Sequence, residues 1–92
     1  MYRVRSTKAY RKAYKRVSKH KDFNAEMLGE IIDALVAGEK LPANRRDHQL
    51  TGELKVYREC HVKDNLLLQY QIHEDILVLL LVDLGTHDDL FG

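Results

Sequence analysis

The stretch that decides the fold runs from residue 66 to residue 82 and reads LLLQYQIHEDILVLLLV. Two apolar runs, residues 66–72 and 76–82, flank the turn-forming pair Glu74-Asp75. Short runs rich in Leu, Ile and Val with a turn between them predict two β-strands joined as a hairpin. The second run contains no polar side chain, which is typical of a strand at the centre of a sheet.

The residues around this hairpin predict further strands. Residues 54–62 alternate apolar with polar side chains, and the pair Asp64-Asn65 then provides a turn signal. We expect Cys60 and Val62 to face the core. Residues 2–5 also alternate, which predicts a short first strand, and Gly85 is expected to end the last one.

Two helices are expected between the first strand and the second. Ser6 or Thr7 can cap the first helix and Asn24 the second, because their side-chain oxygens can accept hydrogen bonds from free N–H groups of the first turn. Gly38 is placed to end the second helix. The order βααβββ predicts one α+β domain, residues 1–92, in which two N-terminal helices pack on one face of a small, mostly antiparallel four-stranded sheet. The apolar residues with helical spacing are Tyr10, Ala13, Tyr14 and Val17 in one segment and Met27, Leu28, Ile31, Ile32, Leu35 and Val36 in the other.

Charge is distributed unevenly along the chain. Every charged residue before Asp22 is Lys or Arg, including Lys12 and Lys15. In the last third of the chain, by contrast, most charged residues are Asp or Glu. A basic segment of this kind can bind a polyanion, or it can simply form a solvated helix face. Cys60 is the only cysteine, so no internal disulfide can form. Because no stretch reads as a signal peptide or a membrane span, we expect a soluble, cytoplasmic protein.

Histidines provide the main chemical signal. His48, His61 and His87 lie at the ends of expected strands or in the loops beside them. Imidazole can give or take a proton near neutral pH, so these residues suggest proton-transfer chemistry. Glu59 and His61 lie two positions apart in one expected strand and therefore point to the same face. In a generic antiparallel sheet, an ordinary polar outer face is the more common explanation of such a pair.

The residue types favour one kind of chemistry over others. Three histidines could bind zinc, but no HxH, HxxxH or CxxC spacing supports a metal site, and we expect none. The chain also has no glycine-rich phosphate loop and no serine nucleophile motif. Imidazoles and a carboxylate beside Lys and Arg can cleave RNA without a metal. A base removes the proton of the 2′-OH, an acid protonates the leaving 5′-oxygen, and cations stabilise the phosphate.

Three segments occur in a fixed order in this half of the chain. They read Asp47-His48-x-Leu50-x-Gly52, Tyr57-Arg58-Glu59-Cys60-His61-Val62 and Gly85-Thr86-His87-x-x-Leu90-Phe91-Gly92. Together they resemble the RelE/YafQ superfamily of bacterial toxin ribonucleases, and within it the YafQ branch.

The resemblance implies the toxin of a type II toxin–antitoxin pair. Such a toxin cuts mRNA in the ribosomal A site, uses no cofactor and is held inactive by a cognate antitoxin protein. The resemblance makes His48, Glu59, His61 and His87 the catalytic group and gives Phe91 a role in positioning the substrate. We expect His87 to be the acid, and His61 or His48, oriented by Glu59, to be the base. The basic first helix, with Lys12 and Lys15, would contact ribosomal RNA through its phosphates.

Two residues depart from the pattern of the YafQ branch, and one of them is Asn65, where the branch tends to have an acid, although Asp64 is adjacent. That branch usually has Arg two residues before the Gly of the Gly-Thr-His segment, where this chain has Asp83. An Arg would clamp the scissile phosphate, whereas an Asp repels it. A nuclease of lower activity or altered RNA preference, a toxin of the same fold that binds DNA gyrase, and a nuclease-dead relative therefore remain alternatives. If the chain is a nuclease, the replacement cation would come from Lys55, Arg58, Arg45 or Arg46.

Overall fold

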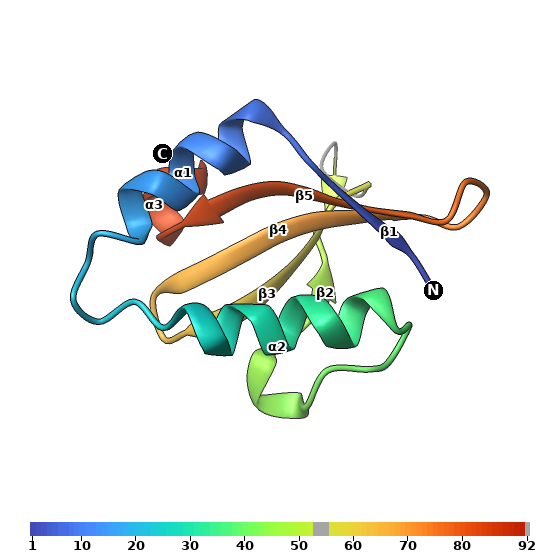
Figure 1. The fold of residues 1–92 in the computed structure, drawn as a ribbon, viewed down its shortest axis with the longest axis horizontal. Coiled ribbons are helices and arrows are strands. Elements are labelled where there is room, and N and C mark those ends of the chain that lie inside the picture. The colour runs from blue at the N-terminus through green and yellow to red at the C-terminus, as the bar shows by residue number, and fades with distance from the viewer. Residues whose placement is uncertain (53–55, 92) are drawn as a thin grey trace.

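The computed structural model describes residues 1–52 and 56–91, which form a five-stranded mixed sheet with three α-helices (Figure 1). The sheet order is β1-β5-β4-β3-β2. Strand β1 runs parallel to β5, and the other neighbouring strands are antiparallel. The predicted α+β class is therefore confirmed. In chain order the elements are β1 (Arg3–Ser6), α1 (Lys8–Val17), α2 (Ala25–Val36), the 3₁₀ turn η1 (Ala43–Arg45), β2 (His48–Gln49), β3 (Arg58–Lys63), β4 (Leu66–His73), β5 (Val78–Gly85) and α3 (His87–Phe91).

The predicted four-stranded sheet was wrong, because the sheet has a fifth strand. Strand β2 lies in the segment that was expected to be a loop, and it pairs His48 with Glu59 and Gln49 with Arg58 of β3. Two residues are too few for an alternating pattern to be visible in the sequence. The expected start of the following strand, Leu54, lies outside the described residues; β3 itself begins at Arg58.

The last hairpin is shifted along the chain relative to the prediction. Ile76 and Leu77 belong to the turn rather than to β5, and both side chains are more than half exposed. Leu77 has a φ of 54°, in the left-handed region that tight turns use and side chains rarely adopt. Gly85 is the last residue of β5, so the strand ends there as predicted. The apolar run is therefore longer than the strand at its beginning and shorter at its end.

Both N-terminal helices begin at the predicted caps. The Thr7 hydroxyl accepts a hydrogen bond from the backbone N–H of Tyr10 at 3.0 Å, and the Asn24 side chain accepts one from the N–H of Met27 at 3.0 Å. The Thr7 hydroxyl also donates to the carbonyl of Val82 in β5 at 2.6 Å, which ties the start of α1 to the sheet. The helix prediction is confirmed in both segments.

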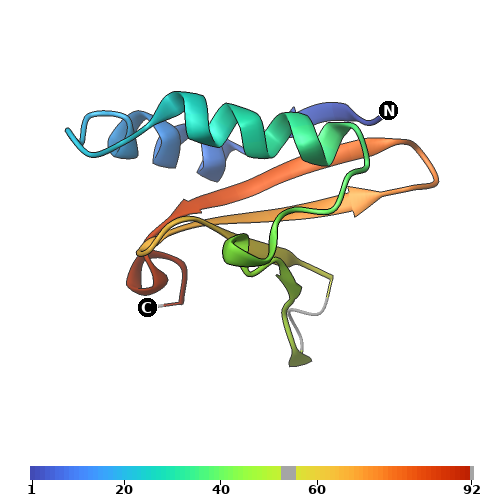
Figure 2. The same cartoon turned by 90° about the horizontal axis from the view of Figure 1, so that it is seen from below.

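Helices α1 and α2 pack against one face of the sheet, and the hydrophobic core lies between them (Figure 2). Cys60 and Val62 are fully buried there, as predicted. Apolar burial of this kind is the main stabilising contribution to a small domain. The core-forming residues of the sheet are Cys60, Val62, Leu68, Tyr70, Leu79, Leu81 and Leu84.

The opposite face of the sheet, here called the open face, carries α3 at one end (Figure 2). The sequence did not predict this helix. It begins with reciprocal hydrogen bonds, because the Thr86 hydroxyl accepts from the N–H of Asp89 and the Asp89 carboxylate accepts from the N–H of Thr86. This is the capping-box arrangement with Asp in place of Glu. In the described part of the chain, none of the helices has the length and apolar character needed to cross a membrane.

Candidate active site

A row of polar residues crosses the open face from β2 to β5. His48 lies opposite Glu59, Glu59 opposite Gln69, and Gln69 opposite Asp83. A β-bulge follows Gln69, where the register between β4 and β5 shifts. The row therefore combines an imidazole, two carboxylates and an amide on one side of the sheet.

His48 and Glu59 form the central pair of this row. The distance between His48 Nε2 and Glu59 Oε2 is 3.4 Å, and the Glu59 side chain is only 6% exposed. The other oxygen of Glu59, Oε1, is buried and has no hydrogen-bond partner among the described residues. A buried carboxylate with an unused acceptor is costly unless it has a cation or a ligand to bind.

The backbone beside His48 offers a hydrogen-bond acceptor to one ring nitrogen. His48 Nδ1 lies 2.6 Å from the carbonyl oxygen of Arg46, and a carbonyl can only accept a hydrogen bond. In the neutral tautomer in which Nδ1 donates this hydrogen bond, Nε2 carries the lone pair and can accept a proton. After that transfer, the imidazolium would face the Glu59 carboxylate.

His61 lies one row further along the same face. It pairs with Leu67, which in turn pairs with Gly85, so His61 and Gly85 are separated by two strand spacings, roughly 10 Å. A broad groove of ≈ 1180 Å³ runs past His61. Its walls include the cations Arg45, Arg46 and Lys63 together with Thr86, the residue before α3. The groove thus connects two of the predicted catalytic segments.

Helix α3 carries His87 and Phe91 at the end of the open face. Their ring centroids are 4.7 Å apart and tilted by 40°, and the Phe91 side chain is 38% exposed. The first turn of α3 packs so closely against Gly85 that a Cβ at this position would lie 2.8 Å from Asp89 Cβ. Arg16 of α1 lies 3.6 Å from the Asp89 carboxylate and adds an ion pair to this contact.

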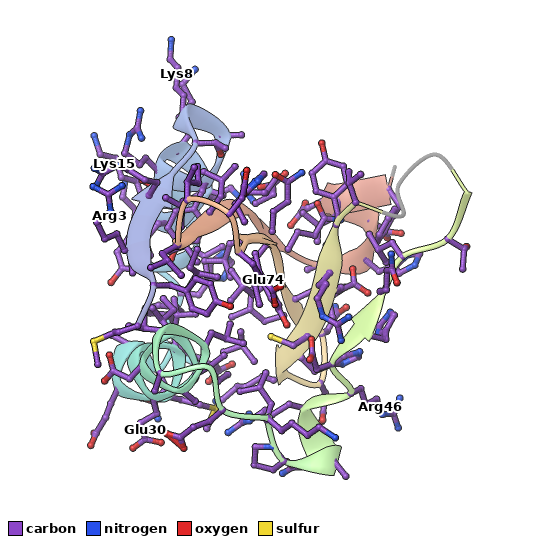
Figure 3. The ribbon with its side chains drawn as sticks, turned by 90° about the vertical axis from the view of Figure 1, so that its right-hand side faces the viewer. Arg3, Lys8, Lys15, Glu30, Arg46 and Glu74 are labelled. Carbon is purple, nitrogen blue, oxygen red and sulfur yellow. The ribbon has the colours of Figure 1, made fainter. Side chains whose placement is uncertain are left out.

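The predicted RNA-binding cations lie in three different places. Arg45 and Arg46 line the groove beside His61, although the Arg45 guanidinium also donates to the carbonyl of Val62 at 2.8 Å. Lys55 lies outside the described residues. Lys12 is exposed on α1. Lys15 also projects from α1, on the side of the molecule away from Arg46 (Figure 3).

Arg58 has a different environment from the one expected of a phosphate ligand. Its position in β3 has the parity of Cys60 and Val62, so it faces the helix side of the sheet. There its guanidinium donates to the Asp47 carboxylate at 3.1 Å, and this hydrogen bond raises the pKa of Arg58. Arg58 therefore binds another residue of the chain, behind the His48–Glu59 pair.

Asp47, Gln69 and Tyr70 were not singled out by sequence reasoning, yet Gln69 belongs to the polar row and the other two lie behind it. The only sequence signal for Asp47 was its place beside His48 in the motif Asp47-His48-x-Leu50-x-Gly52. Gln69 and Tyr70 looked like ordinary members of an alternating strand. Their roles depend on the pairing of β3 with β4, which a single sequence does not reveal.

Cys60 has no place in the chemistry of the open face. It is fully buried on the helix side, and burial raises the pKa of its thiol to about 12. A thiol of this kind behaves as a small apolar side chain, as predicted. Within residues 1–52 and 56–91, no three His, Cys, Asp or Glu side chains lie close enough to hold a metal ion.

Comparison with known families assigns the chain. Residues 2–92 match the model of a family described as the bacterial toxin of type II toxin–antitoxin systems, YafQ. The chain belongs to the YafQ family. The resemblance inferred from three short motifs is therefore confirmed over nearly the whole chain.

Individual YafQ proteins and their structures agree with this assignment. The mRNA interferase toxin YafQ of Escherichia coli K12 is 36% identical over 75 residues, which cover 80% of this chain and 77% of that protein. A putative toxin YafQ of Haemophilus influenzae is 55% identical over 31 residues, 34% of this chain and only 30% of that protein. A metal-bound toxin from Helicobacter pylori is 37% identical with a TM-score of 0.91, covering 99% of this chain and all of that one. YafQ in the E. coli DinJ–YafQ complex is 27% identical with a TM-score of 0.88, and each chain is covered completely.

Proposed function

We propose that this chain is the toxin of a type II toxin–antitoxin pair and that it cleaves mRNA with His48, Glu59, His61 and His87 as its catalytic group. The observation that carries the proposal is the His48–Glu59 pair, which faces the open side of the sheet beside His61. The name mRNA interferase, given to the E. coli relative, supplies the substrate class. The DinJ–YafQ complex supports a cognate antitoxin as the partner that holds this toxin inactive.

His48 is the base in this proposal. Its Nε2 accepts the proton of the ribose 2′-OH, because in this proposal Nδ1 carries the hydrogen of the hydrogen bond to the Arg46 carbonyl. The attacking 2′-oxygen then forms a bond to phosphorus as the bond to the 5′-oxygen breaks. The Glu59 carboxylate, 3.4 Å from Nε2, stabilises the imidazolium that forms. This pairing favours His48 over His61 as the base, and it requires no metal.

His87 is the acid that protonates the departing 5′-oxygen. It is exposed at the start of α3, directly after β5, and its place in the Gly-Thr-His segment supports its assignment as the acid. An acid and a base on opposite sides of the phosphate suit in-line displacement. Phe91, stacked beside His87, offers an exposed ring on which an unpaired base can stack.

Cations in the groove take the place of the arginine that the YafQ branch usually has at position 83. Asp83 carries a negative charge into the polar row, and its carboxylate accepts a hydrogen bond from the N–H of Leu84. Arg45, Arg46 and Lys63 line the groove next to His61 and can offset this charge at the phosphate. Lys12 and Lys15 on α1 are too far around the molecule for this task, and we assign them to ribosomal RNA.

Primer extension on a reporter mRNA tests the proposal. The wild-type chain, His48→Gln, His87→Ala and the control His73→Ala are induced in a bacterium, and the mRNA is mapped after induction. His73 lies at the end of β4, where its Nε2 atom is 2.8 Å from Gln71 Oε1. We expect cuts in translated regions with the wild type and with His73→Ala, and none with the other two variants.

Other outcomes would assign the other functions. Growth arrest with intact mRNA and altered DNA supercoiling would indicate a gyrase-binding toxin. Normal growth with intact mRNA would indicate a nuclease-dead relative, as Asp83 could suggest. Cleavage of ribosome-free RNA in EDTA would separate the chemistry from the ribosome and from any metal.

A further inference from the structure

The position of His48 depends on a very short strand. Strand β2 has two residues, and its ladder to β3 consists of the pairs His48–Glu59 and Gln49–Arg58, extended by a hydrogen bond from Leu50 N–H to the Tyr57 carbonyl at 3.0 Å. A two-residue strand at a sheet edge gains little from its own hydrogen bonds. Other contacts must therefore hold the His48 ring at its distance from Glu59.

Asp47 supplies these contacts on the opposite side of the strand. Its carboxylate accepts one hydrogen bond from the Arg58 guanidinium at 3.1 Å and another from the Tyr70 hydroxyl. The Asp47 side chain is 24% exposed, and Tyr70 is fully buried. Burial, together with the bond to Asp47, raises the pKa of Tyr70, so the phenol stays protonated and remains a donor.

These contacts join β2 to β3 and β4, two of the three strands that carry the rest of the polar row. Arg58 precedes Glu59 in β3, and Tyr70 follows Gln69 in β4. Because neighbouring residues of a strand point to opposite faces, Asp47, Arg58 and Tyr70 form a polar cluster directly behind His48, Glu59 and Gln69. Each member of the cluster is thus adjacent in sequence to one member of the row.

The backbone before Asp47 is strained, which adds to the need for a clamp. Arg46 has a φ of 51°, in the left-handed region that costs a residue with a Cβ about 1 kcal/mol or more. Its carbonyl is the acceptor for His48 Nδ1. If the Arg46 backbone relaxed, this carbonyl would turn away and the His48 ring would lose its hydrogen bond. The contacts of Asp47, the next residue, are therefore needed to keep Arg46 in the strained conformation.

We propose that Asp47 is a positioning residue, which clamps β2 to Arg58 and Tyr70 so that the Nε2 atom of His48 faces Glu59. The proposal rests on the proposed function, because it assigns Asp47 its effect on cleavage through His48. It also gives Arg58 a role behind the site, in place of a direct contact with an RNA phosphate.

Steady-state cleavage of RNA by Asp47→Asn tests the proposal. Asn keeps the shape but cannot serve as the anionic acceptor for Arg58. We expect kcat to fall about tenfold or more, since a shift near 1 Å in a catalytic group costs about a hundredfold, while KM stays within about twofold. In the same sample, the NMR resonances of the His48 ring should move towards those of the exposed His20. Thr7→Ala, which removes the cap of α1 and destabilises the fold by a similar amount, should change neither kcat nor the His48 resonances.

Further variants separate the explanations. Tyr70→Phe removes a single donor, so it should give an intermediate loss of kcat even if Asp47→Asn fails to fold. Arg58→Ala should add nothing to Asp47→Asn; an additional rise in KM would show that Arg58 contacts RNA and would overturn its assignment. Full kcat in Asp47→Asn, with His48→Gln inactive, would refute the clamp alone. Full activity of His48→Gln would instead refute the proposed function, and the NMR comparison would then decide whether Asp47 positions the ring.

Discussion

The substitution Gly85→Ala tests how α3 holds His87 at the end of the open face. A Cβ added at residue 85 would lie 2.8 Å from Asp89 Cβ, 2.9 Å from Asp89 Oδ2 and 3.3 Å from the Arg16 guanidinium. Carbon atoms in ordinary contact are about 3.5–4.0 Å apart, so the first turn of α3 must move outwards by about 1 Å. His87 begins this helix and moves with it.

The expected cost is small for stability and large for cleavage. Overpacking destabilises by about 1–3 kcal/mol, and the short terminal helix can yield, so we expect a value near the lower limit. A displacement of about 1 Å at a catalytic group lowers the rate by about a hundredfold. Urea denaturation and cleavage of a reporter mRNA measure the two effects on the same preparation.

A matched glycine substitution provides the control for this experiment. Gly29 lies within α2, and a Cβ at this position would meet no atom within 4 Å. Gly29→Ala should therefore leave cleavage unchanged and stabilise the chain by about 0.5–1 kcal/mol through its helix propensity. Wild-type cleavage by Gly85→Ala, with its predicted loss of stability confirmed, would show that the exact position of α3 does not matter and that His87 is not the acid.

Three further predictions concern single side chains. Asp83→Arg should raise the cleavage rate about tenfold or more by adding a cation to the polar row, whereas Asp83→Asn should raise it less; equal rates in all three proteins would show that the groove already supplies the charge. Hydrogen bonds from Thr86 lower the pKa of Asp89, so its contribution to α3 is present above the ordinary carboxyl pKa and is lost as the pH falls through the lowered one. NMR shifts of Phe91 should follow this transition in the wild type and lose it in Asp89→Asn. Cys60, with its pKa raised to about 12, should react with a thiol reagent at pH 8 far more slowly in the native protein than in urea, and a fast native reaction would contradict its burial.

The long elements of this fold were predictable from the sequence because each carries its own pattern. Helices α1 and α2 have an apolar face with helical spacing and a capping side chain at the start. Strands β4 and β5 have enough apolar residues to be recognised even where their ends shift. In these elements local propensity and tertiary packing favour the same structure, which is what makes a pattern informative.

The elements that position the candidate site were not predictable in this way. Strand β2 exists because Asp47 and the ladder to β3 hold it there, and its two residues contain no pattern. Helix α3 has only five residues, too few to show a helical pattern, although Thr86 and Asp89 form a local reciprocal cap. Strand β2 depends on contacts with residues that are distant in the sequence, and α3 adds to its local cap an ion pair from Asp89 to the distant Arg16. The histidines themselves could be found from residue type and motif, whereas the partners that orient them could not.

The division of the sheet into two faces explains why these small elements carry the chemistry. The helix side must exclude water to stabilise a chain of only 92 residues, so its apolar residues are fixed by packing. The open face does not have to meet that requirement. It contains the buried Glu59 carboxylate, whose Oε1 atom has no hydrogen-bond partner among the described residues, and binding a proton or a ligand would offset the free-energy cost of burying it. His48 and His87 lie on the two short elements of this face, β2 and α3. The position of His48 therefore depends on the Asp47 side chain, and the position of His87 depends on the lack of a side chain at Gly85. Substitutions at Asp47 and Gly85 should change the geometry of the proposed site more than most substitutions in the core.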